Sequence, residues 1–457
     1  MSSSFTISTP SLLSGQGIDV ASTVQQLVTA ARAREQNWLL QQQQIQQQEG
    51  VVNQINTALS TLLSNVNALK DAGGALQSVA VTSGNSSIVT ATATAGASFG
   101  THVVVVNNLA STASYYSAAA NLKTTDSLGT GSFDLTIGGN TQTIDLNNQT
   151  LGQLATSING MTVNGQPLGV TASVITDSAG AHLVIVANNS GAASAFTIDG
   201  ANAPGLGLTQ GSAGADASAT IDGVPVSSAN NTVSGAIPGV TLQLQSKAVG
   251  QEVRIQTQAD TQAATQAVTY FVNAYSNIIQ GLNAQFAVTP STGGANSTSP
   301  LESDGTVRMV QQQLLNFMTQ TFGNNADFST LRSVGISMND DGTLKLDSTQ
   351  LSDAIKNHYS SFLDFFQGTT GFATSFSSQL SKLTDPIKGA FYVDLKGMQS
   401  TYSSLQDRVN SFELYIASQQ QVWLQQYTQL NVALLQWPFQ QQMMDTLFGT
   451  GNSSSKK

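Results

Sequence analysis

The residues that could do chemistry are few in this chain, and they are scattered along it. Gly96-Ala97-Ser98-Phe99-Gly100 matches the G-x-S-x-G pattern, which exposes a nucleophilic serine on a strand–turn–helix elbow. Here the next segment, from His102 to Val106, reads as a strand, so that context fails. The other two histidines, His182 and His358, lie in unrelated segments. We therefore expect a hairpin turn at this motif and no Ser-His-Asp hydrolase.

A second candidate, Asn339-Asp340-Asp341-Gly342, is similar to part of a calcium-binding loop. With Gly342 at position six of such a loop, Ser337 stands at position one and Ser348 at position twelve, where a bidentate carboxylate is needed. The chain also has no phosphate-binding loop, dinucleotide fingerprint or metalloprotease helix. We expect no catalytic residue, no metal and no cofactor.

Composition excludes some classes of partner. Charged residues make up 9% of the chain, well below the usual share of about a quarter. Most of the polar surface must therefore consist of Ser, Thr, Asn and Gln side chains. The net charge of −10 argues against nucleic acid, because phosphate binding needs clustered Lys and Arg. Such a surface suits a protein whose faces pack against many neighbours.

Cysteine is absent, which removes disulfides, thiolate metal sites and cysteine nucleophiles. A chain without cysteine can also be exported unfolded and refold outside without an oxidation step. No run of about 18 apolar residues occurs, so we expect no membrane insertion. Residues 1–17 lack the charged and apolar regions of a Sec signal peptide.

The elements follow a helix–sheet–helix order. From Asp19 to about Lys70 the pattern is helical, and from Leu76 to about Asp260 short alternating segments are separated by Gly, Asn-Asn and Asp-Gly turns. Helices return from Thr261. This order predicts an α+β multidomain fold in which an all-β region is inserted into a helical unit built from both ends of the chain.

Heptad periodicity supports a pairing of the two ends. Apolar residues recur at a and d positions over about six heptads in each outer helical region, which is typical of a coiled coil. The predicted helix-pairing seam consists of Val24, Leu27, Trp38, Ile45, Val52, Ile55, Leu59, Leu62, Val66, Leu395, Tyr402, Leu405, Val409, Phe412, Ile416, Trp423 and Leu430.

Polar residues interrupt this seam near both termini. They occupy d positions at Arg34, Gln41 and Gln48 on the first helix, and at Gln419 and Gln426 on the last. An antiparallel pairing would stack these polar layers on one another, which fixes register at a cost in stability. We expect a weak distal coil and a well-packed proximal half; solvated Gln-rich helices that never pair are the alternative.

The helical region between the coil segments reads as a compact domain. Phe271, Tyr275 and Ile279 form one apolar stripe, and the segment from Ile336 to Asp347 predicts a hairpin that turns at Asp341-Gly342. A short helix with Phe362 and Phe366 on its apolar face follows. We expect these aromatic side chains to form core.

Several segments together resemble the flagellar filament cap protein family, also called hook-associated protein 2. Gly17-Ile18-Asp19-Val20 is similar to the family's opening motif. The order and spacing of the later segments resemble the family as well: Phe99 to Ala110, Leu135 to Gly139, Thr150 to Asn159, Gly169 to Val174, Ala219 to Val224, Asn231 to Leu242, Phe271 to Ser276, Leu301 to Asp304, and Leu331 to Leu346.

The resemblance implies a non-enzymatic protein at the distal tip of a bacterial flagellar filament. It implies a pentamer-like ring of copies that promotes flagellin polymerisation and prevents leakage of exported monomers. It also implies flagellin, the flagellar type III export apparatus and its chaperone as partners. Many members have a proline where Arg34 stands, so the sequence leaves open whether the first helix continues past Arg34.

Together, pattern and resemblance divide the chain into an export segment, a helical stalk and leg, two β domains and a tail. The expected ranges are 1–18 for a disordered export segment, 19–75 with 261–448 for the terminal coil and leg, 76–122 with 213–260 for one β domain, 123–212 for the inserted second β domain, and 449–457 for a disordered tail. The distal part of the coil is expected at about 19–48 and 416–448.

Three other functions stay open at this point. One is an adhesin or binding module at the filament tip that takes a host surface ligand. Another is a hook–filament junction protein, against which the segments from Asn231 to Leu242 and from Gly335 to Leu346 favour the cap. An extracellular enzyme comes last.

Overall fold

The computed structural model describes residues 18–119, 121–199, 205–286, 300–302, 304–323 and 325–448. Residues 1–17 of the expected export segment, residues 287–299 within the expected leg, and the expected tail lie outside the described residues.

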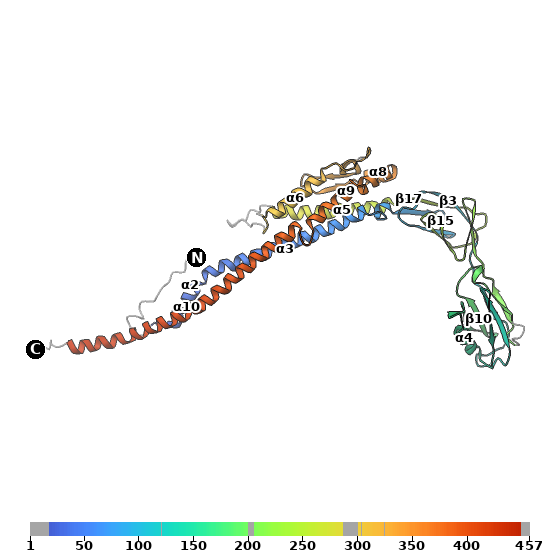
Figure 1. Ribbon diagram of the computed structural model, residues 1–457, viewed down its shortest axis with the longest axis horizontal. Helices are drawn as coiled ribbons and strands as arrows, with labels where there is room; N and C mark the ends of the chain where they lie inside the picture. Colours follow the sequence, from blue (N-terminus) through green and yellow to red (C-terminus); the bar gives the residue numbers. More distant parts are fainter. Residues whose placement is uncertain are drawn as a thin grey trace.

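The chain forms a long helical stalk, a helical leg and a two-part β head (Figure 1). The helices α2 (Val20–Ala31) and α10 (Ala390–Phe448) lie side by side at one end of the molecule. The domain that holds α4 (Leu151–Asn159) and β10 (Gly180–Ala187) lies at the other end. Among the described residues, we find no helix with the length and apolar content needed to cross a membrane.

Three helices build the stalk: α2 (Val20–Ala31), α3 (Ala33–Lys70) and α10 (Ala390–Phe448). The Asp19 carboxylate caps α2 by accepting a hydrogen bond from the Ser22 backbone N–H at 3.1 Å. The break between α2 and α3 falls at Arg32, and α3 runs through Arg34 without interruption. The predicted fold class is confirmed, because the helices at the two ends of the chain pack together.

The leg packs five further helices and a hairpin against α3. Its core is aromatic and includes Phe271, Phe317, Phe362, Phe372 and Phe376. The predicted hairpin forms from β18 and β19. The elements of the leg are α5 (Thr261–Phe286), α6 (Gly305–Met318), η3 (Leu331–Val334), β18 (Ile336–Met338), β19 (Leu344–Leu346), α7 (Ser348–Asn357), α8 (Tyr359–Gln367) and α9 (Phe372–Leu383).

The β domain next to the leg is a sandwich of two antiparallel sheets, reached from α3 through η1 (Ala75–Gln77). One sheet has the order β1-β17-β3-β13-β14 and the other β15-β16-β2. The strands are β1 (Val79–Ser83), β2 (Val89–Ala93), β3 (Gly100–Asn108), β13 (Ala217–Ile221), β14 (Val224–Ser228), β15 (Thr232–Ile237), β16 (Val240–Leu244) and β17 (Val253–Ala259).

The hairpin predicted at Gly96-Ala97-Ser98-Phe99-Gly100 is wrong. The strands on either side, β2 and β3, belong to different sheets and do not pair with each other. The segment instead carries the chain across the sandwich. The reason is that β2 pairs with β16 and β3 pairs with β17 and β13, all distant in sequence.

The inserted domain has its own core, built from a four-stranded sheet of order β12-β4-β10-β9, a three-stranded sheet of order β11-β5-β6, and α4 (Leu151–Asn159). Because β4 pairs with β10, the insertion starts before residue 122, earlier than expected. The other elements are β4 (Ser114–Ser117), β5 (Ser132–Ile137), β6 (Asn140–Asp145), β7 (Thr162–Val163), β8 (Gln166–Pro167), β9 (Val170–Asp177), β10 (Gly180–Ala187), η2 (Ala192–Ser194), β11 (Phe196–Asp199) and β12 (Leu208–Ser212).

Candidate functional site

The pairing of α10 with α2 and α3 is antiparallel and keeps one register along the stalk. The Ile18 backbone N–H donates to the Asn431 Oδ1 at 2.7 Å. Further along, the rings of Trp38 and Phe412 meet edge to face at 5.5 Å between centroids. The Gln42 Nε2 donates to the Gln406 Oε1 at 3.1 Å, and the Gln46 Nε2 donates to the Tyr402 hydroxyl at 3.1 Å. As residue numbers rise on α3, they fall by nearly the same amount on α10.

Most of the predicted seam residues face inward, but not all of them face α10. The buried ones are Val24, Val52, Ile55, Leu59, Leu62, Val66, Leu405, Val409 and Ile416. The half-buried ones are Leu27, Trp38, Ile45, Leu395, Tyr402, Phe412 and Trp423, whereas Leu430 is exposed.

The proximal part of the expected seam has a different partner. The register places Ala390, the first residue of α10, opposite Ala58, so Leu59, Leu62 and Val66 lie beyond the start of α10. These three residues belong to the leg core, where α3 packs against α5 and α9. The distal half alone is a two-helix coil.

The expected polar layers on α3 lie one residue too early. Arg34 and Gln41 are exposed, while Glu35 and Gln42 are 4% and 6% exposed and occupy the seam. Gln48 is half-buried and its Nε2 donates to the Pro300 carbonyl at 2.8 Å. In the distal half, two series of residues spaced seven apart therefore face the partner helix. One consists of Val24, Ala31, Trp38 and Ile45, and the other of Val28, Glu35, Gln42 and Glu49.

The physical reason is the change of partner along α3. In the leg, helices on two sides bury α3, and the series with Ile55 and Leu62 turns inward. In the stalk, α10 is the helix of the described part of the chain that packs along α3, and the line of contact on α3 moves to the neighbouring residues. The step from Glu49 to Val52 to Ile55 is three residues twice, an irregularity that locally overwinds a coil.

On α10, the expected polar positions are only partly covered. Gln419 is half-buried and Gln426 is exposed. Past Asn431, which meets Ile18, the described residues of α10 have no paired helix and expose several apolar side chains. These include Val432, Leu435, Trp437, Phe439, Met443, Met444, Leu447 and Phe448.

The distal coil rests on a small apolar cluster and an ionic cluster. Val24, Val28 and Ile416 form the apolar cluster. Beside it the Arg32 guanidinium donates to both carboxylate oxygens of Glu413, at 2.7 Å each, and its Nη1 lies 3.6 Å from the Glu35 Oε2. Sequence reasoning missed Arg32, Glu35 and Glu413, although a charged pair at Arg32 and Glu35 so near an apolar stripe is a usable signal.

Two carboxyl groups in the stalk have raised pKa values. Burial, followed by the hydrogen bond and the charge of Glu413, raises the pKa of Glu35, although Arg32 opposes this. At the other end of the seam, burial and the nearby carboxylate of Asp304 raise the pKa of Asp394 to about 6. A carboxyl whose pKa is raised by folding stabilises the folded state at low pH, and this contribution is lost as the pH rises through the folded value.

We expect the distal coil to be more stable near pH 5 than near pH 7.5. Replacing Glu35 by Gln should remove part of this dependence and raise the melting temperature of the coil by a few degrees at pH 7.5. The amide can donate to Glu413 without taking up a proton. Thermal melts followed by circular dichroism at both pH values would measure this. The matched control is Asp407→Asn, an exposed carboxyl on α10; an equal effect of both substitutions would contradict the assignment.

The histidines do not form a catalytic site with Ser98. The three imidazoles pair with Asp222, Asp177 and Asp327, each in a different domain, at 2.7 to 3.2 Å. The Ser98 carbonyl accepts from the Thr257 hydroxyl at 2.8 Å. Within the part of the chain that the structure describes, no three His, Asp or Glu side chains converge on a point where a metal ion would bind.

Comparison with known families decides what this stalk and head belong to. Two family models match this chain. The model described as "Flagellar hook-associated protein 2 N-terminus" matches residues 16–113, and the model described as "Flagellar hook-associated protein 2 C-terminus" matches residues 214–437. The chain belongs to the flagellar hook-associated protein 2 family. This is the family of filament cap proteins, which are structural and not enzymes. The two matched regions contain the leg, the adjoining β domain, and the stalk except for the last turns of α10 after residue 437.

Individual relatives of the family agree over most of their length. The B-type flagellar hook-associated protein 2 of Pseudomonas aeruginosa is 27% identical over 72% of this chain and 76% of its own. The flagellar hook-associated protein 2 of Escherichia coli is 27% identical over 92% of this chain and 94% of its own. The crystal structure of three domains of the flagellar cap protein FliD from E. coli superposes with a TM-score of 0.60, at 23% identity, over 76% of this chain and 99% of that one.

Proposed function

We propose that this chain caps the distal tip of the flagellar filament and aids the assembly of flagellin there. The observation that carries the proposal is the match of both ends of the chain to one cap family, together with a stalk in which those two ends pair. A stalk made from both ends projects a single head, which suits a protein that must stand on the end of a filament.

The proposal includes a ring of identical copies that contacts flagellin. We infer a pentamer-like ring from the resemblance. The flagellar type III export apparatus and its chaperone are proposed as partners during export, and a host surface ligand as a partner at the tip.

We further propose that the stalk grips the filament end weakly enough to release it at each subunit addition. Glu35 and Gln42 lie in the seam, and the Glu49 Oε1 is buried without a hydrogen-bond partner among the described residues. Polar groups in a seam reduce pairing stability compared with an apolar seam. The polar layers therefore favour a coil that opens and closes.

Deletion of the gene tests the function directly. We expect short or missing filaments and flagellin monomers in the growth medium, both restored by the intact chain. Electron microscopy of the purified protein should show a closed ring. Normal filaments without leakage in the deletion strain would contradict the capping role, and a monomer without ring formation would favour a tip adhesin.

A further inference from the structure

We propose that His182 is a proton-dependent latch in the inserted domain, which fastens the chain where it leaves β4 to the turn between β9 and β10. The His182 Nδ1 lies 2.6 Å from the Ser117 carbonyl oxygen at the end of β4. Its Nε2 lies 3.2 Å from the Asp177 Oδ1 at the end of β9. Capping does not call for such a group, so the latch goes beyond the proposed function.

The two acceptors determine the charge of the ring. A carbonyl oxygen and a carboxylate oxygen accept hydrogen bonds and have no hydrogen to donate. Both ring nitrogens of His182 must therefore carry a hydrogen to make both contacts, and a ring with two N–H groups is a cationic imidazolium. A neutral ring has one N–H, so it keeps one contact and turns a lone pair toward the other oxygen.

The Asp177 carboxylate stays ionised throughout this change. Its Oδ1 also accepts from the Ala179 N–H at 2.7 Å and from the Gly180 N–H at 3.1 Å, within the β9–β10 turn. The Ala179 hydrogen bond, followed by that of His182, holds the pKa of Asp177 below its ordinary value. The group that gains and loses the proton is therefore His182.

The same contacts raise the pKa of His182. The Ser117 carbonyl contributes most, Asp177 follows, and desolvation of the ring opposes them. A histidine whose pKa is raised by folding stabilises the fold fully below its ordinary value of 6.5, and this contribution is lost as the pH rises through the folded value. The latch is therefore closed in acid and opens on the alkaline side of pH 6.5.

Asp177 is the only charged side chain that the surrounding elements supply. Across β4, β9, β12 and α4, which the structure describes in full, every other side chain is uncharged. The chain after β4 carries Lys123 and Asp126, and the Asp126 carboxylate accepts from the Lys123 backbone N–H at 2.8 Å. The His182 side chain is 17% exposed, so protons from the medium reach it.

The latch lies where the backbone pairing of β4 with β10 ends. The last paired residues are Tyr116 and Val184. Past them Ser117 continues the contact in another way: its hydroxyl oxygen accepts from the Leu183 N–H at 2.8 Å, and its carbonyl accepts from the His182 ring. Loss of the ring contact therefore loosens the end of β4 before it affects the paired strands.

The chain beyond β4 then contacts the β9–β10 turn. The Asn121 N–H donates to the Ala179 carbonyl and the Ala181 N–H donates to the Leu122 carbonyl, both at 2.7 Å. A Cβ on Gly180 would lie 2.8 Å from the Leu122 carbonyl oxygen, so the two segments are in close contact. An open latch should weaken these two hydrogen bonds first. At a filament tip, the position proposed for this chain, the domain meets the pH of the medium directly.

The test is amide hydrogen exchange of the full chain at pH 5.5 and pH 8.5, corrected for the intrinsic change of exchange rate with pH. We expect the amides of Asn121, Ala181 and Leu183 to lose protection at least about threefold at pH 8.5. His182→Gln should give the low protection at both pH values. Asp177→Asn keeps an oxygen that caps the turn and removes the charge, so the loss of protection should begin at a lower pH.

His102→Gln and His358→Gln are the matched controls. Within the described part of the chain, each of these rings has a hydrogen bond at Nδ1 alone, to Asp222 and to Asp327. A neutral ring can make one such bond, so neither histidine has to be charged. Both control variants should keep the pH dependence of the unaltered chain in the inserted domain.

A direct measurement of the proton keeps the test decisive even where His182→Gln fails to fold. The chain has three histidines, so the two control variants assign the His182 signals of ¹⁵N-histidine-labelled protein by elimination. Both ring nitrogens should be protonated at pH 6, and the titration midpoint should lie above 6.5. Equal protection of the unaltered chain at both pH values, a pH dependence that His182→Gln retains, or a His182 midpoint at or below 6.5 would each overturn the proposal.

Discussion

Replacing Ile416 by Asp is expected to separate the distal coil while the leg and head stay folded. Ile416 is 1% exposed and joins Val24 and Val28 in the small apolar cluster of the coil. Loss of such a side chain costs about 2–5 kcal/mol, and desolvation of the new carboxylate adds to this. Amide hydrogen exchange should become fast in residues 20–31. A bacterial strain that carries the Ile416→Asp variant should release flagellin into the medium, as the deletion strain does.

Leu414→Asp is the matched control for this experiment. Leu414 lies two residues away on α10 and is 75% exposed, so its replacement should leave exchange in residues 20–31 unchanged. Equal protection of that segment in the Ile416 variant and in the unaltered chain would show that the coil does not depend on this cluster. Unchanged filament growth in a strain with the Ile416 variant would show that capping does not require the distal coil.

Replacing Phe372 by Ala should give the largest loss of stability in the leg. The side chain is fully buried, and its ring centroid lies within 5.3 Å of Phe271 and Phe322 and 5.6 Å from Phe376. Removing a core phenylalanine costs about 3–5 kcal/mol, because the cavity does not close completely. For a domain of this size the leg transition in calorimetry should fall by about 6–20 °C.

The two head domains have separate cores, so their transitions should not move with the Phe372 variant. Tyr270→Ala is the control within the leg, since Tyr270 is 55% exposed on α5 and its loss should change stability by about 0.5 kcal/mol or less. An equal effect of both substitutions would contradict an aromatic core centred on Phe372.

The order of domains could be predicted from the sequence because each part has its own hydrophobic period. The heptad repeats at both ends predicted the helical stalk, and the alternation of apolar and polar residues between them predicted the inserted β head. Both patterns depend only on local backbone geometry. The hairpin at Asp341-Gly342 was also predictable, because its turn residues favour it locally.

Features that depend on distant partners could not be predicted in this way. A single heptad frame placed Arg34 and Gln41 in the seam, whereas Glu35 and Gln42 occupy it. The frame cannot include the change of partner on α3, from α10 in the stalk to α5 and α9 in the leg. For the same reason Gly96 to Gly100 read as a hairpin, although β2 and β3 pair with strands more than a hundred residues away.

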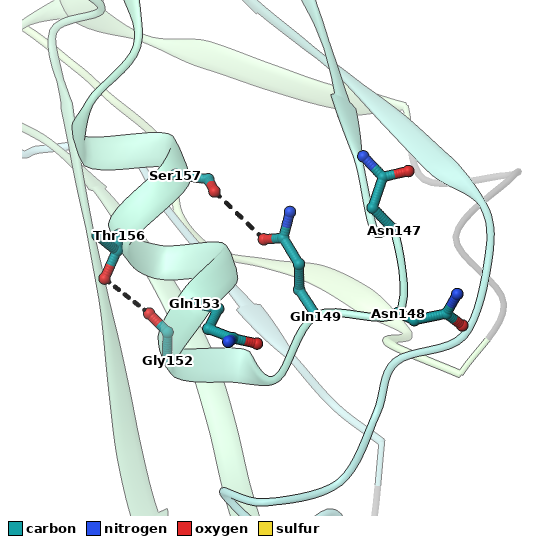
Figure 2. A pocket seen from close by; sticks show the side chains of 7 residues that line it. All are labelled: Asn147, Asn148, Gln149, Gly152, Gln153, Thr156 and Ser157. Carbon is teal, nitrogen blue, oxygen red and sulfur yellow. Dashed lines mark hydrogen bonds between the residues drawn. The ribbon is translucent and has the colours of Figure 1, made fainter.

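The inserted domain also has an open polar hollow between the β6–α4 loop and the first turns of α4 (Figure 2), which was not predicted for another reason. Asn147, Asn148 and Gln153 are common surface residue types, and nothing in their spacing indicates that they share a concave surface. Two consecutive asparagines before a capped helix are a signal for a left-handed turn, but not for a site.

The central claim is that the two ends of this chain pair as antiparallel helices, and spin-label distances test it most directly. The chain has no cysteine, so cysteines placed at exposed positions are its only labelling sites. Labels at Gln36 and Ser411, and at Ser22 and Gln425, should both give short, narrow distances in double electron–electron resonance. The pair Gln36 and Gln425 should give a distance longer by up to about 20 Å, because a helix rises 1.5 Å per residue. Long or broad distances for both of the first two pairs would contradict the stalk.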